Sequence, residues 1–204
     1  MAVVCAMKRD GAVYMATTST ITVNDTRLPI TKDENLNIRK IGKDILIASA
    51  SDDKTAQNLY LHDSWFRLKA GEELNRERLA TKIVTKFIQI LDAKELLKRD
   101  SYGYPQMDCS ILIARGDRLF CIKEDFSVFE YDSVIAISSG EESRFCEVYL
   151  FENSEREPTT DPDALLAKTL YECDKVMTGA GTDVAIIDTK SMKFRRYEKS
   201  EDKR

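Results

Sequence analysis

The sequence predicts an α+β protein in which two β-sheets are packed between two pairs of helices, a four-layer αββα sandwich. Three observations predict it: the chain begins with short apolar strand patterns, helical patterns then arrive in pairs, and two strands close the chain. Sheets whose helices come in pairs can bury one face on those helices and the other on a second sheet. We expect one domain over residues 1–197 and a charged, disordered tail over residues 198–204.

The first part of the chain has strand patterns only. Val3–Met7 and Ala12–Ala16 are short apolar segments, and the Lys8–Gly11 segment between them ends in a glycine that suits a hairpin turn. Residues 17–26 are rich in Thr and Asn, which favours a loop or an edge strand. Two more strands are expected at Asn37–Ile41 and Asp44–Ala50.

Two pairs of helices follow, separated by further strands. Ser51–Asp53 offers N-caps for a first helix that Gly71 closes. Asn75 caps a second helix, in which apolar residues recur every 3.6 positions as far as Leu91. The second helix pair is expected over Gly140–Glu152 and Asp161–Met177.

The remaining strands complete the two sheets. Tyr102–Pro105 is expected to be a connecting loop. The strands between the helix pairs are Asp108–Ala114, Arg118–Lys123, Ser127–Tyr131 and Val134–Ser138. Asp161 followed by Pro162 gives the fourth helix a capped start. The chain closes with a hairpin of Val184–Asp188 and Met192–Tyr197.

Composition narrows the class of function. The chain has 204 residues, a net charge of -4 and a pI near 5.3, with no basic cluster, so nucleic acid is not expected as a partner. The longest apolar runs, such as Ile45–Ala48, are far too short to cross a bilayer. The N-terminus lacks the residue order of a secretory signal. We therefore expect a cytoplasmic protein that does not contact a membrane.

Cysteine and histidine content limits the available chemistry. Five widely spaced cysteines lie in apolar segments, which predicts buried free thiols. Because no Cys/His cluster exists, we expect no metal site, and we expect no cofactor. His62 is the only histidine, which excludes any histidine relay that is not built on it. An enzyme of this sequence would more readily use a carboxylate, a lysine or an α-amine as its base.

Several local sequences, taken in order, match one family. The chain opens with Val3-Val-Cys-Ala-Met-Lys-Arg-Asp-Gly11, an apolar stretch that runs into a turn. Ile38–Ile41 and Ile45–Ala50 form the next strand pair. Val134-Ile-Ala-Ile-Ser-Ser-Gly140 precedes the third helix, and Thr182-Asp-Val-Ala-Ile-Ile-Asp188 is the final apolar strand. In this order and spacing, over nearly the whole chain, they resemble the proteasome β-subunit family, especially the bacterial HslV-type peptidase.

The resemblance implies the Ntn-hydrolase fold and a catalytic scheme built on the first residue of the mature chain. In that family the hydroxyl of a Thr attacks an amide carbonyl, and the α-amine of the same residue accepts the proton. A lysine lowers the pKa of the nucleophile, and an aspartate orients that lysine. A backbone N–H stabilises the oxyanion.

Carried over by position, the resemblance places Ala2 where the nucleophile should be. Thr18 falls at the position of the aspartate. The position of the lysine falls near Asn37, with Asn35 and Leu36 as neighbouring registers, and none of the three is basic. Ser49 falls at the glycine of the oxyanion site, where its backbone N–H can still be offered. A methyl group cannot attack a carbonyl, and neither Thr18 nor Asn37 carries a charge.

Three further positions keep polar side chains. Ser139 matches the serine beside the amine of the nucleophile, and Asp174 and Thr178 lie where β-subunits keep an Asp and a Ser after the fourth helix. The hydroxyls also have a simpler interpretation: Ser139 caps the third helix, and Thr178 caps the loop that follows the fourth.

Two other groups of nucleophiles are present. Trimming of the first four residues would expose Cys5, but its apolar neighbours favour a buried strand residue. Thr17–Thr20 forms a hydroxyl cluster that is typical of a turn or an edge strand.

Two functions remain open from the sequence. The first is a proteasome-like or HslV-like subunit that assembles into a ring, alone or with an ATPase or sister subunits, and lacks threonine-peptidase activity. The second is an N-terminal-nucleophile amidohydrolase or peptidase with a non-standard site or processing. The loss of several members of one catalytic unit favours the first, because losing one already removes most of the rate.

Overall fold

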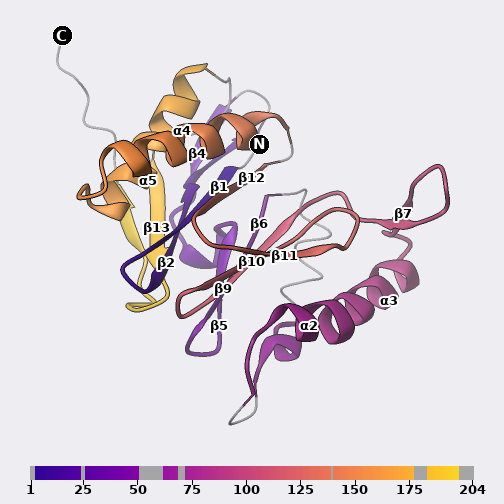
Figure 1. Ribbon diagram of the computed structural model, residues 1–204. Helices are drawn as coiled ribbons and strands as arrows, with labels where there is room; N and C mark the ends of the chain where they lie inside the picture. Colours follow the sequence, from indigo (N-terminus) through magenta and orange to yellow (C-terminus); the bar gives the residue numbers. More distant parts are fainter. Residues whose placement is uncertain are drawn as a thin grey trace.

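The computed structural model describes residues 3–23, 26–50, 62–68, 72–138, 140–176 and 183–197. Two five-stranded antiparallel sheets form its centre (Figure 1). The first sheet contains, in spatial order, β12 (Val134–Ser138), β1 (Val3–Arg9), β2 (Ala12–Thr18), β13 (Val184–Asp188) and β14 (Arg195–Tyr197). The second contains β11 (Val128–Tyr131), β10 (Arg118–Ile122), β9 (Ile111–Arg115), β6 (Ile45–Ser49) and β5 (Ile38–Ile41).

Helices cover the outer face of each sheet. The first sheet is covered by α4 (Glu142–Arg156) and α5 (Pro162–Val176). The second is covered by α2 (Arg76–Arg78), the π-helical segment η3 (Leu79–Val84) and α3 (Thr85–Ala93). The order helices, sheet, sheet, helices confirms the predicted four-layer αββα sandwich (Figure 1).

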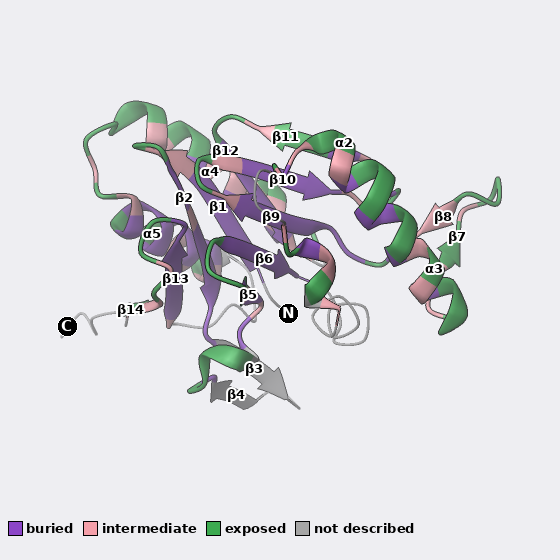
Figure 2. Ribbon diagram, turned by 90° about the horizontal axis from the view of Figure 1, so that it is seen from below, coloured by how far each residue is buried: buried purple, intermediate pink, exposed green. Residues whose placement is uncertain are grey.

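Alternating side chains of β1 connect two of the apolar layers. Val3 and Cys5 belong to the cluster between the first sheet and helices α4 and α5. Val4 and Ala6 belong to the cluster between the two sheets. Successive side chains of a strand point to opposite faces, so one strand contributes to both layers. All four residues are at most 2% exposed, and the buried strands form the interior in Figure 2.

The second sheet is divided in the same way. Leu112 and Ala114 of β9 face the first sheet, whereas Ile111 and Ile113 face the helices of the other outer layer. Phe87 of α3 packs among the latter group and is 1% exposed. Each sheet is therefore buried on both faces, which explains why its strands read as continuous apolar runs.

Several segments differ from the sequence prediction. Strand β2 continues to Thr18 instead of ending at Ala16. Residues 17–26, expected as a loop or an edge strand, also contribute to a separate two-stranded hairpin of β3 (Thr20–Val23) and β4 (Thr26–Pro29). A 3-10 turn, η1, follows at Asp33–Asn35.

Two strand boundaries differ as well. The expected loop Tyr102–Pro105 is the end of a short hairpin of β7 (Lys98–Arg99) and β8 (Pro105–Gln106). The last strand begins at Arg195 and not at Met192, because Met192 has φ 52° and its N–H donates to the carbonyl of Asp188 in a turn.

The predicted first helix falls mostly on residues outside the described ranges, and so does the predicted tail over residues 198–204. Within the described segment 62–68, the chain forms a 3-10 turn, η2 (Asp63–Phe66).

The predicted N-caps of the second and fourth helices are confirmed. The Asn75 carboxamide oxygen accepts the N–H of Arg78 at 2.8 Å, and the Asp161 carboxylate accepts the N–H of Ala164 at 3.2 Å. Pro162 is the first residue of α5, as its fixed φ favours. The third helix begins at Glu142, two residues after the predicted start.

All five cysteines are buried free thiols, as predicted. Burial raises the pKa of Cys121 to about 12. A hydrogen bond with Cys146, together with burial, raises the pKa of Cys173, so both thiols stay protonated at neutral pH. Within the described ranges, no group of three or more His, Cys, Asp or Glu side chains could hold a metal ion. None of the helices in the described part of the chain is both long and apolar enough to span a bilayer.

An ion-pair network joins α5 to the β13–β14 hairpin. The Arg195 guanidinium donates to the carboxylates of Asp163 at 2.8 Å and Asp188 at 2.7 Å. Asp188 also accepts the Ser191 hydroxyl at 2.6 Å and the N–H of Lys190 at 2.8 Å. Burial opposes ionisation of Asp188, but these hydrogen bonds outweigh it and hold the pKa of the carboxyl below its usual value.

Replacing Asp188 by Asn removes the charge that this network binds. Because the folded pKa of Asp188 is depressed, its carboxylate contributes stability above the unfolded pKa, and that contribution is lost as pH falls through the folded pKa. We expect D188N to lower the free energy of unfolding by about 1–3 kcal/mol at pH 7, with a smaller difference from wild type below about pH 4.

Urea unfolding at both pH values measures this effect. The control is Asp132→Asn, whose side chain is 97% exposed in a 3.5 Å pair with Lys8 and should change little. An equal loss for D188N at both pH values would contradict the prediction.

Candidate functional site

The beginning of β1 lies at one open end of the layer between the sheets. Val3 pairs with Ser138 of β12, and Val4 pairs with Thr17 of β2. The Thr17 hydroxyl donates to the carbonyl oxygen of Val3 at 3.0 Å, which adds a side-chain bond between β2 and the first residue of β1. β1 therefore begins between the ends of two neighbouring strands. Ala2 itself lies outside the described residues.

Thr18 ends β2 beside the beginning of β1. It is 1% exposed and pairs with Val184 of β13. Its hydroxyl oxygen is buried and makes no hydrogen bond within the described part of the chain. A threonine hydroxyl here cannot orient a lysine by charge, which is the role that the resemblance assigns to an aspartate.

Asn37 and Ser49 are brought together in the second sheet. The backbone N–H of Ser49 donates to the carbonyl oxygen of Asn37 at 3.1 Å. The expectation that this N–H is available for an oxyanion was wrong, because the pairing of the segment before β5 with the end of β6 already uses it. The Ser49 hydroxyl is buried and lies 3.5 Å from the sulfur of Cys109.

Of the three supporting positions, one is described. Asp174 lies near the end of α5 and is half-buried, whereas Ser139 and Thr178 lie outside the described residues. The structure thus brings Asn37 and Ser49 together, and it places Thr18, at the end of β2, beside the beginning of β1.

Ser138 is a site residue that the sequence analysis missed. Its hydroxyl accepts the N–H of Ser143 at 3.0 Å and of Gly140 at 3.3 Å, and donates to the carbonyl of Gly140 at 2.6 Å. It therefore ties the end of β12 to the first turn of α4, a role that was predicted for the neighbouring Ser139. Two serines stand next to each other before Gly140, and their local sequence does not show which one caps the helix.

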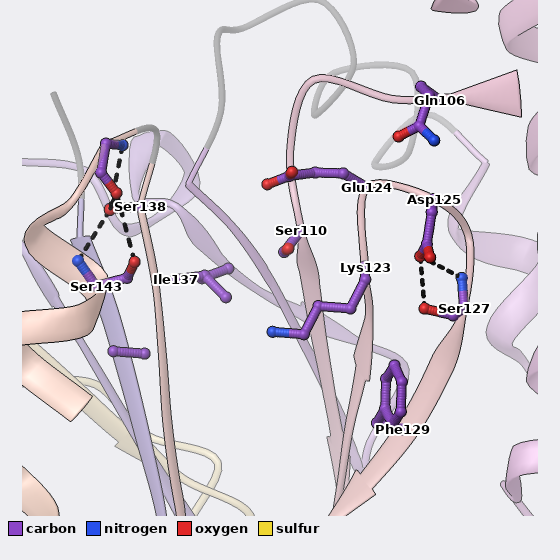
Figure 3. A pocket seen from close by; sticks show the side chains of 12 residues that line it. Gln106, Ser110, Lys123, Glu124, Asp125, Ser127, Phe129, Ile137, Ser138 and Ser143 are labelled. Carbon is purple, nitrogen blue, oxygen red and sulfur yellow. Dashed lines mark hydrogen bonds between the residues drawn. The ribbon is translucent and has the colours of Figure 1, made fainter. Parts of the chain in front are cut away.

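A polar cavity of about 550 Å³ opens beside Ser138. Ser138 and Ser143 line one wall, and Ser110, Lys123 and Glu124 line the other, at the ends of β9 and β10 (Figure 3). The Lys123 side chain points across the cavity toward the strand that carries Ser138 (Figure 3). The cavity can therefore hold a polar group between a cation and several hydroxyls.

Lys123 keeps its proton at neutral pH. Partial burial lowers the pKa of its ammonium, but the neighbouring Cys121 and Tyr131 raise it, and the net pKa lies above the usual value. Lys123 forms no salt bridge with another described residue. A permanently charged ammonium can bind an acceptor but cannot take a proton from a nucleophile. Nothing in the sequence marked Lys123, because it follows a buried strand and has no motif around it.

No protein-family model matches the sequence, and no curated protein matches it. Solved structures do. BPH of Thiobacillus denitrificans superposes with a TM-score of 0.71 at 18% identity, over 98% of this chain and 100% of that chain. A structure of BPH in complex with epoxomicin gives a TM-score of 0.70 at 17% identity, over 91% of this chain and 97% of that chain. Eukaryotic HslV from Trypanosoma brucei gives a TM-score of 0.60 at 12% identity, over 91% of this chain and 98% of that chain.

These similarities confirm the resemblance to HslV at the level of the fold. At identities of 12–18% they establish that this chain shares the fold of BPH and HslV over nearly its whole length. The chemistry of the site has to be judged from its own residues.

Ser138→Ala tests the connection between β12 and α4. Loss of the hydroxyl leaves the N–H groups of Gly140 and Ser143 without their acceptor, so we expect about 1 kcal/mol less stability. The matched control is Ser154→Ala near the other end of α4, where the hydroxyl donates to a carbonyl of its own helix. Urea unfolding of both variants measures the difference, and equal effects would count against the capping role.

Proposed function

We propose that this protein is a non-catalytic subunit of a self-assembling, HslV-like particle. The observation that carries the proposal is an alanine, Ala2, at the position that the family reserves for its nucleophile. Superposition on BPH over 98% of the chain supports carrying that position over to Ala2. A methyl side chain has no lone pair with which to attack a carbonyl carbon.

The neighbouring positions support the same conclusion. Thr18 is neutral and buried, and Asn37 supplies no ammonium to lower the pKa of a nucleophile. The N–H of Ser49 is already donated within its sheet. The scaffold of the site is thus retained while the groups that would perform each step are not.

Self-assembly and location are parts of the proposal. The HslV-like fold supports a ring, in which the chain associates with copies of itself and, as further partners, an ATPase or sister subunits. Five buried free thiols are compatible with a reducing cytoplasm, where we place the particle.

A second candidate is an amidohydrolase or peptidase with a non-standard site. The cavity beside Ser138, with Lys123 opposite two serines, favours it because a cation and hydroxyls converge there. We prefer the non-catalytic subunit because position 2 is an alanine and neither Thr18 nor Asn37 carries the charge that the family scheme needs.

The assembly part is tested by size-exclusion chromatography with light scattering at several protein concentrations. We expect a discrete particle many times heavier than the 23.3 kDa chain. A monomer at every concentration would contradict the proposed function.

The catalytic part is tested with fluorogenic peptides. We expect no turnover above the blank for the wild type, and little for Ala2→Thr, because positions 18 and 37 still lack their charges. The triple variant Ala2→Thr/Thr18→Asp/Asn37→Lys should exceed Ala2→Thr by on the order of a thousandfold. Thr18→Asp/Asn37→Lys with Ala2 retained is the control, and intact mass establishes the first residue of each chain. Turnover by the wild type would refute the absence of activity.

A further inference from the structure

A short hairpin projects from the body of the protein. Strands β7 and β8 and the residues between them, here called the β7–β8 arm (residues 98–106), extend beyond the end of α3 in both ribbon views (Figures 1 and 2). The arm carries two of the most exposed large side chains among the described residues, Tyr102 at 85% and Tyr104 at 67%.

The backbone of the arm is held by its own hydrogen bonds. The Asp100 carboxylate accepts the N–H groups of Tyr102 and Tyr104, both at 2.9 Å. The Asp100 carbonyl accepts the N–H of Gly103, whose φ of +85° suits glycine, and Arg99 donates to the Gly103 carbonyl at 3.2 Å. Arg99 also reaches Asp92 of α3 at 3.4 Å. The two rings are therefore presented on an ordered loop.

Exposed tyrosines on an ordered loop have the properties of binding anchors. A tyrosine buries a large area on contact and loses little side-chain entropy, since it has only two torsions. Interfaces are accordingly enriched in tyrosine, and a few such residues carry most of the binding energy.

A pocket that suits a tyrosine lies on the same chain. It has a volume of about 380 Å³ and is lined by Leu74, Arg115, Gly116 and Arg118, among others. Both guanidinium groups are fixed: Arg115 binds the Asp44 carboxylate at 2.6 Å, and Arg118 contacts a carboxylate of β11 at 2.7 and 2.8 Å. The Arg118 guanidinium already lies over the Phe120 ring, 5.0 Å from its centroid. Because guanidinium planes bind aromatic rings through cation–π contacts, an incoming ring would extend this arrangement, and Leu74 adds an apolar surface.

The arm and this pocket lie at opposite ends of β9 and β10. The arm leads into Met107, whose N–H donates to the carbonyl of Glu124 after the end of β10. The pocket is built on the turn at Gly116, where β9 joins β10 at the other end. The five residues of β9 span about 17 Å, so the arm cannot reach the pocket of its own chain.

We infer that the β7–β8 arm of one copy inserts Tyr102 or Tyr104 into the Arg115–Arg118 pocket of the next copy. The two surfaces are different and lie at opposite ends, so the contact is head-to-tail, the kind that forms a ring when the rotation between successive copies closes. This inference rests on the proposed self-assembly and gives it a specific contact.

Two variants test the contact by analytical ultracentrifugation. Tyr102→Ala/Tyr104→Ala removes the rings of the arm, and Asp117→Trp fills the mouth of the pocket at an exposed turn residue. Each should weaken self-association by about thirtyfold or more relative to wild type. Lys98→Ala, which truncates an exposed side chain on the same arm, should leave assembly unchanged. Circular dichroism confirms that each variant is folded.

A mixture of the two variants separates a head-to-tail contact from a general loss of assembly. The arm variant keeps its pocket and the pocket variant keeps its arm, so the equimolar mixture should form a 1:1 complex that neither variant forms alone. Wild-type assembly that persists in Tyr102→Ala/Tyr104→Ala would overturn the arm contact and leave the proposed function intact. A monomeric wild type would refute both.

Discussion

The structure depends on the alternation of side chains along β1. Val3 and Cys5 point to the helices, whereas Val4 and Ala6 point to the second sheet, and every one of these positions is buried. A shift of one residue in the pairing of β1 would exchange the two sets and place each in the wrong layer. Apolar packing on both faces therefore fixes the register of the strand, and the register fixes where β1 begins between its neighbours.

The contacts that hold the beginning of β1 do not depend on the side chain at position 2. Thr17 and Ser138 hold the beginning of β1 through backbone pairing and one hydroxyl bond, and neither contact needs a nucleophile at position 2. The β5–β6 pairing uses the N–H of Ser49 for the sheet itself. Stability and activity thus make separate demands on these positions, and substitutions that remove charges from a buried site need not disturb the layers around it.

The sequence predicted correctly those features that depend on residues close together in the chain. The layer order, the Asn75 cap and the Asp161–Pro162 start of α5 follow from periodicity and capping chemistry within a few residues. The features that were missed depend on distant parts of the chain. Strand β2 reaches Thr18 because β13, more than 160 residues later, pairs with it. Lys123 could be recognised as a site residue only from the structure, in which the ends of β10 and β12 line the same cavity.

In the proposed non-catalytic subunit, position 2 carries no nucleophile. Intact-mass analysis after incubation with epoxomicin, the compound in one BPH structure, tests it most directly. A chain without a reactive group at its N-terminal end is expected to keep its mass. A chain that gains the mass of the compound, with the adduct mapped to its N-terminal peptide, would contradict the claim.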